Sequence, residues 1–537
     1  MLGRAELGGH VSSLLRSNVV VASGTLLSRL TGLARVAVFA MVIGQTALAD
    51  AYNGANSSPN AIYELLLGGV LSASLVPMFT KQATDRDDRA TTAIISTAVV
   101  ALTGLTTLAV IAAPWVFRLF SIRVHDGVDP TEFRDAGTTL ARIFLFQIFF
   151  YGITALAAAL LQARRRFFAA AWAPVLSNVI IIISLLLVWN EFDGREPQLV
   201  EVLSNDRLAW TLGLGATLGI AVTALALVPA LRAAEVPLGF NPEFRHPAVK
   251  RLLRMSIWTF GYVVANQLAI IVVQNLAEPG SGGPDAYSKA YIFFVLPHGL
   301  LAMSIVTTFT PELASSVKAR DRAAFTDRMS LGLRLIALLT IPAAAGMFVL
   351  RRPLIGVALQ HGNFTAAAAL NTSRALGGFA IGLIGFSLYL FALRGFYAHE
   401  DTRTPFVINL VENLINIVLA WVLYDRFGVL GLGLAFAIAY LVTAVWSLQV
   451  LSYKMRGFQV AGTLRRIAPM LLAGVVMAEV MWVAARLVGG NVGLAALVRV
   501  VVAGIVGIAT YLGVLMLLRV PELDQVRSRF AAKFGRS

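Results

Sequence analysis

Long apolar segments that carry almost no charge constrain this sequence more than any other feature. The run Val175–Trp189, for example, contains no charged residue. A helix that crosses the hydrocarbon core of a bilayer needs about 20 such residues. About 14 windows of this kind can be drawn along the chain, at 18–43, 54–80, 91–117, 136–162, 167–189, 208–231, 252–276, 286–314, 329–350, 375–396, 404–424, 428–452, 467–487 and 494–518. Strands of an outer-membrane barrel would alternate apolar and polar residues instead. The sequence therefore predicts an all-α polytopic membrane protein with about 14 transmembrane helices.

Composition supports a membrane protein and argues against catalysis. Of the 537 residues, 58% are hydrophobic and 14% are charged, whereas a soluble protein is about 25% charged. The first apolar run is too long for a signal peptide and carries Arg29 and Arg35, so we expect it to stay as the first helix. Cysteine is absent and the six histidines are scattered. Because no nucleotide-binding, zinc-peptidase or serine-hydrolase motif occurs, we predict no enzyme, no catalytic residue, no metal and no cofactor.

The net charge of +15 is distributed unevenly between loops. With the predicted helices in place, the N-terminus, every second loop and the C-terminus carry about 28 Lys and Arg, and the other loops about 10. Positive charge marks the cytoplasmic side, so both termini should be cytoplasmic. We interpret the basic residues as topology signals and contacts to anionic headgroups, not as a nucleic-acid surface.

An internal repeat divides the chain. The residues DAYNGA at Asp50–Ala55 return as DAYSKA at Asp285–Ala290, and three further matches follow in the same order. The repeat predicts an N-lobe at 1–235 and a C-lobe at 236–458, each with six helices around a central cavity, followed by two extra helices at 459–518 and a basic cytoplasmic tail at 519–537. Transporters built from parallel repeats bind their substrates at the repeat interface.

Two arginines inside the first apolar run are the main candidate site. Arg29, Gly32 and Arg35 are spaced three apart, so they share an arc of about 120° on a helix. The two arginines are about 9 Å apart along the axis, and Gly32 leaves a notch between them. Such a stripe suits a phosphate or diphosphate. Alternatively, Arg29 snorkels to headgroups if the helix begins later.

A few other ionisable residues occur in the predicted spans. Asn60 and Glu64 share a face of the second helix, where Glu64 either neutralises an arginine or takes part in coupling. Lys289 follows Asp285 by four residues, which favours a helix-end ion pair. Near the C-terminus, Glu479 and Arg499 could pair with each other.

The eleventh predicted helix carries a polar stripe within an otherwise apolar segment. Such a stripe either coordinates a cation or joins helices through interhelical hydrogen bonds. The sequence leaves both interpretations open for the four residues Asn409, Glu412, Asn413 and Asn416.

Four stretches of this chain resemble one known family. They are SRLTGLAR, DAYNGANSSPNAIYELLLGGVLSASLVP, YSKAYIFFVLPHGLLAMSIVTTFTPELA and FYAHEDTRTP, at Ser28–Arg35, Asp50–Pro77, Tyr287–Ala314 and Phe396–Pro405. They resemble the MviN/MurJ lipid II flippases, and YELLLGGVL is similar to an actinobacterial-type member.

The resemblance implies a fold of the multidrug/oligosaccharidyl-lipid/polysaccharide exporter superfamily, in which the last two helices border a groove for the lipid tail. It also implies lipid II, the undecaprenyl-diphosphate-linked peptidoglycan precursor, as the substrate. The flippase would move it to the outer leaflet of the bacterial cytoplasmic membrane by alternating access, for cell-wall synthesis and cell shape. By the match, Arg29 and Arg35, with Ser28 and Gly32 of the same motif, would meet the diphosphate.

Other positions follow from the same resemblance. Asp50 and Asn60 match recurring motif positions. The chain departs from the family at Val36, where an acidic residue is common, and at Tyr63 and Glu64, where many members carry arginine.

The family carries an arginine in its eighth helix that has no clear match in this chain. Lys289 is the one candidate for its replacement. A sodium site proposed for some members would map near Asn266, Asn409 and Asn413, which lack carboxylates. Coupling to the membrane potential or to a cation therefore stays open.

Two other functions compete with a lipid II flippase. One is a different polysaccharide-lipid or drug exporter of the same superfamily, although an exporter of cationic drugs would need acidic residues where Arg29 and Arg35 stand. The other is a membrane scaffold for cell-wall and division proteins, which are also candidate partners beside lipid II and membrane lipids.

Overall fold

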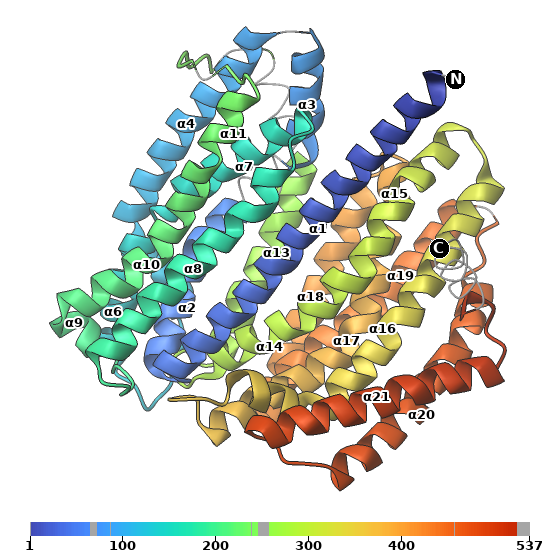
Figure 1. The fold of residues 1–537 in the computed structure, drawn as a ribbon. Helices are drawn as coiled ribbons and strands as arrows, with labels where there is room; N and C mark the ends of the chain where they lie inside the picture. The colour runs from blue at the N-terminus through green and yellow to red at the C-terminus, as the bar shows by residue number, and fades with distance from the viewer. Residues whose placement is uncertain are drawn as a thin grey trace. The chain divides into compact units, whose positions relative to one another are not determined.

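The computed structural model describes residues 2–64, 72–85, 87–237, 239–244, 247, 257–455 and 457–523, and all regular elements in these ranges are helices. The chain divides into two compact units (Figure 1). The first comprises Met1–Gly282 with His361–Phe364, and the second comprises Gly283–Gln360 with Thr365–Ser537.

The first unit is built around helices α1, α2, α6, α8 and α10, whose buried side chains share one hydrophobic core. Helix α1 packs along α8, and α10 packs against both α8 and α6. Its helices are α1 (Leu2–Ile43), α2 (Ala47–Tyr63), α3 (Ser72–Asp85), α4 (Asp88–Ile111), α5 (Ala113–Leu119), α6 (Pro130–Phe144), α7 (Gln147–Ala163), α8 (Phe168–Glu191), α9 (Glu201–Ser204), α10 (Asp206–Ala226), α11 (Val228–Ala233) and α13 (Ile257–Leu276).

The second unit is centred on α17, which packs against α14, α16 and α19. In the most apolar 18-residue stretch of α17, 83% of the residues are buried. The helices of this unit are α14 (Gly283–Pro297), the π-helical turn η2 (His298–Ala302), α15 (Met303–Lys318), α16 (Arg322–Leu359), α17 (Ala366–Ala398), α18 (Arg403–Phe427), α19 (Val429–Lys454), α20 (Val460–Leu487) and α21 (Gly493–Leu517).

Glycines allow α17 and α19 to approach each other closely. A Cβ at Gly382 would lie 2.7 Å from the Cα of Ala437, and one at Gly378 would lie 2.7 Å from the backbone of Gly433. Small residues of this kind let membrane helices pack backbone to backbone. Side chains at these positions would force the two helices apart.

The predicted membrane architecture is confirmed. Twelve helices in the described ranges are long and apolar enough to cross a membrane, and each overlaps one predicted window. The remaining windows, 54–80 and 252–276, include residues outside the described ranges, although the apolar helix Phe260–Leu276 occupies most of the second. The count of about 14 spans therefore stays a prediction. The division into lobes also stays a prediction, because packing units do not test an internal repeat.

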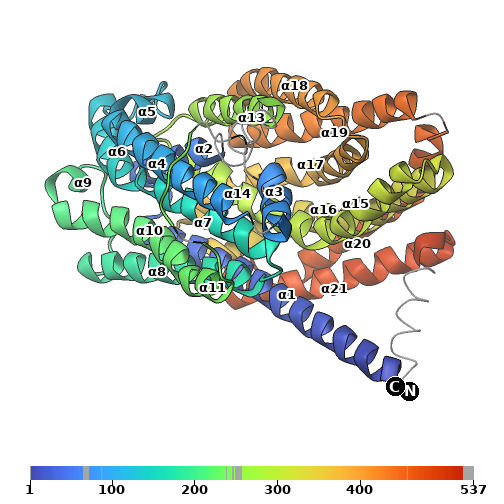
Figure 2. The same cartoon turned by 90° about the horizontal axis from the view of Figure 1, so that it is seen from above.

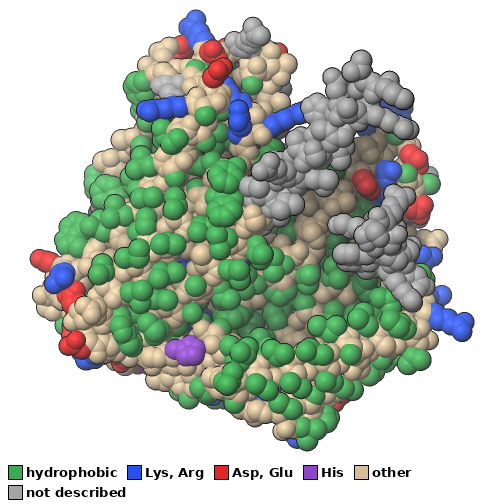
Figure 3. Space-filling model, in the orientation of Figure 1, with side chains coloured by type: hydrophobic (Ala, Val, Ile, Leu, Met, Phe, Trp, Pro, Cys, Tyr) green, Lys and Arg blue, Asp and Glu red, His purple; other side chains and the backbone are tan. Residues whose placement is uncertain are grey.

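Helices α20 and α21 form a hairpin beside α16 (Figure 2). The Tyr511 hydroxyl donates to the carbonyl of Leu338 on α16 at 3.0 Å, and Met470, Met477 and Met481 are buried in the same core. Hydrophobic side chains cover the visible face of this hairpin (Figure 3). An apolar surface of this extent indicates contact with lipid tails.

Two details near the C-terminus differ from or extend the predictions. Arg499 does not pair with Glu479, which is exposed; its guanidinium donates to the Val488 carbonyl at 2.7 Å and to the Gly489 carbonyl, at the C-terminal end of α20. The Arg499 guanidinium thus satisfies carbonyl groups that the end of α20 leaves without intrahelical partners. The predicted tail begins with packed residues, since buried Glu522 pairs with Arg334 of α16; residues 524–537 lie outside the described ranges.

Candidate functional site

Helix α1 presents one polar, small-residue face to α8. The Asn178 side-chain amide of α8 donates to the Ser28 carbonyl at 3.2 Å and to the Thr31 hydroxyl at 3.1 Å. A Cβ at Gly32 would lie 3.7 Å from the same amide nitrogen. The predicted notch at Gly32 therefore lies beside α8, and this face positions α1.

The two arginines of α1 lie in different surroundings within the first unit. Arg29 is exposed, and Arg35 is half-buried. The Tyr52 hydroxyl on α2 and the Tyr151 hydroxyl on α7 lie within electrostatic range of the Arg35 guanidinium. Among the described residues, neither arginine forms an ion pair with a carboxylate.

The two tyrosines near Arg35 each pack against other aromatic rings of the first unit. The Tyr52 ring lies 4.9 Å from Phe39 and 5.0 Å from Phe144, and the Tyr151 ring lies 5.0 Å from Tyr63. Sequence analysis did not single out Tyr52 or Tyr151. Tyr52 lies within the repeated DAYNGA stretch, but no pattern in the sequence shows that it comes close to Arg35.

The two predicted site residues of α2 make few side-chain contacts. The Asn60 amide donates to the Asn56 carbonyl of its own helix at 3.0 Å, and Glu64 is exposed at the C-terminal end of α2. In the ranges that the structure describes, Glu64 makes no ion pair with Arg29 or Arg35. The expectation that Glu64 neutralises one of these arginines is therefore not met in this structure.

Asp50 holds the loop that follows α13. Its carboxylate, only 3% exposed, accepts hydrogen bonds from the N–H groups of Gly280 at 2.9 Å and Gly282 at 2.7 Å. Both glycines have positive φ angles, 100° and 80°, which other residues rarely adopt. These contacts give Asp50 a structural role at the start of α2.

In the second unit, Lys289 forms the expected helix-end ion pair. Its ammonium group donates to the Asp285 carboxylate one turn earlier on α14, and both side chains are buried. Because a buried ammonium group needs a counter-ion, this carboxylate accounts for the position of Lys289.

The polar stripe of α18 is buried in the second unit. Asn413 donates to the Asn409 carbonyl at 2.9 Å, whereas Glu412 Oε2 has no hydrogen-bond partner among the described residues. Electrostatic interactions link Glu412 with Tyr287 and Tyr291 of α14. Asn266 belongs to α13 of the first unit, whereas the stripe belongs to the second, so a shared cation site stays a prediction. Both interpretations of the stripe, cation ligand and interhelical contact, therefore stay open.

Comparison with known proteins identifies relatives along most of the chain. The family model described as lipid II flippase MurJ matches residues 39–503, a range that begins after Arg29 and Arg35. Lipid II flippase MurJ of Burkholderia cenocepacia is 31% identical over 482 residues, which cover 87% of this chain and 90% of the relative. The probable lipid II flippase MurJ of Rhizobium meliloti is 27% identical over 478 residues, which cover 88% and 87%.

Solved structures share the fold. A lipid II flippase MurJ in an inward closed conformation aligns with a TM-score of 0.75 and 22% identity, over 93% of this chain and 99% of that one. A multidrug resistance MATE family transporter of the MOP superfamily, in an inward-facing conformation, aligns with a TM-score of 0.65 and 14% identity, over 82% and 98%. The all-helical transporter fold predicted from the sequence is therefore confirmed.

Proposed function

Because this chain belongs to the MurJ lipid II flippase family, we propose that it moves lipid II from the inner to the outer leaflet of the bacterial cytoplasmic membrane. The observation that carries this proposal is the family match over residues 39–503. Translocation of the peptidoglycan precursor would supply cell-wall synthesis outside the membrane. The uneven distribution of basic residues supports an orientation with both termini in the cytoplasm.

Arg29 and Arg35 are the proposed contacts for the diphosphate of lipid II. A guanidinium group forms paired, charge-assisted hydrogen bonds with phosphate oxygens. Support comes from the absence of a carboxylate partner for either arginine among the described residues, and from the Tyr52 and Tyr151 hydroxyls near Arg35. In this proposal Asn60 and Glu64 border the same path along α2. Ser28, Gly32 and Asp50 position α1 and α2 instead of touching the ligand.

The proposed mechanism is alternating access. Arg29 and Arg35 bind the diphosphate from the cytoplasmic side while the prenyl tail stays in lipid beside α20 and α21. Movement of the lobes then exposes the headgroup on the outer side. A diphosphate carries about two negative charges, so a potential of 100 mV, negative inside, favours outward transfer by roughly 4–5 kcal/mol. Lys289 is not needed as a ligand, because Asp285 neutralises it.

Reconstitution into vesicles that contain lipid II tests the function. The measurement is the fraction of lipid II that becomes accessible outside, with and without an imposed potential. We expect Arg35→Gln and Arg29→Gln each to slow flipping at least tenfold, since a charge-assisted hydrogen bond contributes about 1.5–3 kcal/mol. Arg207→Gln is the control. It removes an exposed arginine at the start of α10 that pairs with Glu191, so this variant should flip lipid II at the wild-type rate.

Each part of the proposal has its own contradicting outcome. Vesicles with wild-type protein that show no more flipping than empty vesicles would contradict the flippase function. Full activity in Arg29→Gln/Arg35→Gln would remove the site assignment but leave the function intact. A flipping rate that does not depend on the membrane potential would contradict only the proposed driving force.

A further inference from the structure

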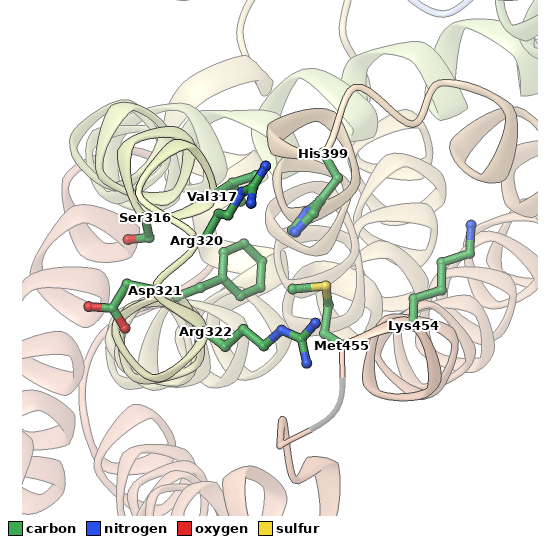
Figure 4. A pocket seen from close by; sticks show the side chains of 9 residues that line it. Ser316, Val317, Arg320, Asp321, Arg322, His399, Lys454 and Met455 are labelled. Atoms are coloured by element: carbon green, nitrogen blue, oxygen red, sulfur yellow. The ribbon is translucent and has the colours of Figure 1, made fainter.

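A cavity of about 470 Å³ opens in the second unit where four helix ends meet. The end of α15 and the start of α16 contribute Arg320 and Arg322, α17 contributes His399, and α19 contributes Lys454 and Met455 (Figure 4). All of these residues belong to one compact unit. None of the residues that line the cavity is among the proposed diphosphate contacts.

The cavity has a rigid apolar base beneath its charges. The Phe325 side chain is buried, and its ring meets His399 edge-on at a centroid distance of 5.0 Å. His399 Nδ1 donates to the carbonyl of Gly395 at 2.8 Å, which leaves Nε2 for another partner. The imidazole is thus held in one orientation by its own helix and by Phe325.

The two arginines of this cavity are not neutralised by the nearest carboxylates. Asp321 accepts the N–H of Ala324 at 2.9 Å as the N-cap of α16, and its side chain points away from the cavity (Figure 4). Asp401 pairs with Lys454. Neither Arg320 nor Arg322 forms an ion pair within the part of the chain that the structure describes. Two exposed guanidinium groups therefore share one cavity without a counter-ion, an arrangement that favours a phosphate group.

The cavity lies at one end of the apolar spans of this unit. Spans α15, α17 and α19 end there and α16 begins there, which is where lipid headgroups meet a membrane protein. Tyr453, which is 89% exposed, and Tyr397 lie at the same helix ends, and exposed tyrosines are typical of the membrane–water interface. The basic loop at 318–322 is on the side that the charge distribution predicts to be cytoplasmic. Basic pockets between helix ends on that side suit anionic lipid headgroups.

We infer that this cavity binds the phosphate of an anionic membrane phospholipid through Arg320 and Arg322, with His399 as a third polar contact. The site goes beyond the proposed transport of lipid II, because it involves another ligand and other helices. A bound headgroup would fasten the cytoplasmic ends of α15, α16, α17 and α19 to one another.

Native mass spectrometry of the purified full-length chain tests this inference. The probes are phosphatidylglycerol and, as a neutral lipid, phosphatidylcholine. We expect retention of phosphatidylglycerol by the wild type and a loss of about fivefold per arginine in Arg320→Gln/Arg322→Gln. The matched control is Arg465→Gln/Arg466→Gln, which removes two exposed arginines from the first turns of α20. The control should bind phosphatidylglycerol like the wild type.

Further arms separate the alternatives. Equal loss of phosphatidylglycerol in the control would show a nonspecific basic surface and overturn the inference. Inorganic phosphate or glycerol 3-phosphate that binds with the same dependence on Arg320 and Arg322, while phosphatidylglycerol does not bind, would identify a soluble phosphate site and overturn the lipid assignment. Arg320→Lys/Arg322→Lys keeps the charge and should retain most of the lipid. Flipping of lipid II by the Gln variant reports separately on the transport function.

Discussion

The Asp50 carboxylate accepts a hydrogen bond at 2.7 Å from the N–H of Gly282, a residue 232 positions later in the chain. Its repeat counterpart Asp285 pairs with Lys289 instead. An aspartate at equivalent positions of the repeat thus has two different structural roles. One holds a loop through backbone N–H groups, and the other neutralises a buried cation.

Asp50→Ala should destabilise the first unit. The change leaves the N–H groups of Gly280 and Gly282 without their carboxylate acceptor, and an unsatisfied buried donor costs about 1–3 kcal/mol. We expect a lower unfolding temperature in detergent, measured by intrinsic fluorescence. Asp126→Ala changes an exposed aspartate in the same unit and should have little effect. Equal unfolding temperatures for both variants would contradict the structural role.

Lys289→Met should destabilise the second unit more than a double substitution does. Removal of the ammonium group takes away the cation that pairs with the buried Asp285 carboxylate, and breaking a buried ion pair costs about 3–5 kcal/mol. Asp285→Asn/Lys289→Met removes both charges and should recover part of the loss. Unfolding by denaturant measures the difference. A double variant less stable than Lys289→Met would contradict this account of the pair.

Gly382→Ala should weaken the contact between α17 and α19. The added Cβ would lie 2.7 Å from the Ala437 backbone, so the helices must separate. Overpacking of this kind costs about 1–3 kcal/mol. Gly504→Ala on α21 is the matched control, because a Cβ there meets nothing within 4 Å. We expect a lower unfolding temperature for the first variant alone, and an equal decrease in both would refute the close-packing argument.

The loop before α18 should lose stability in acid. Burial alone raises the pKa of Asp401, but hydrogen bonds from Lys454 and Thr404 outweigh it and hold the pKa below its ordinary value. The contribution of this carboxylate is therefore complete above about pH 4, the value for an unfolded chain, and is lost as the pH falls through the lower folded value. Asp401→Asn should reduce the dependence of the unfolding temperature on pH in that window, and an unchanged dependence would contradict this assignment.

Apolar length predicted the spans well because membrane insertion depends chiefly on that property, but it did not predict their interruptions. The window 136–162 is one predicted helix, whereas the structure ends α6 at Phe144 and begins α7 at Gln147. No proline or glycine lies between them, so the sequence carries no local signal for this break. Helix α16 begins at Arg322, earlier than the window at 329–350, because its polar first turns lie outside the apolar segment.

The candidate site was predicted less completely, because side-chain partners depend on distant parts of the chain. The spacing of Arg29 and Arg35 placed both arginines on α1, as the structure has them. Their surroundings come from α2, α7 and α8, and helical periodicity says nothing about which helix faces which. The Asn178 contact with Thr31 and the tyrosines near Arg35 therefore needed the folded structure.

The glycines of α17 have a mechanical consequence. Where two main chains touch, one helix cannot slide or rotate past the other without a collision between backbones. Helices α17 and α19 must then move as one rigid body during any transport cycle. Bending has to occur at other places, such as the π-helical turn at His298–Ala302, where the backbone hydrogen bonding is already irregular.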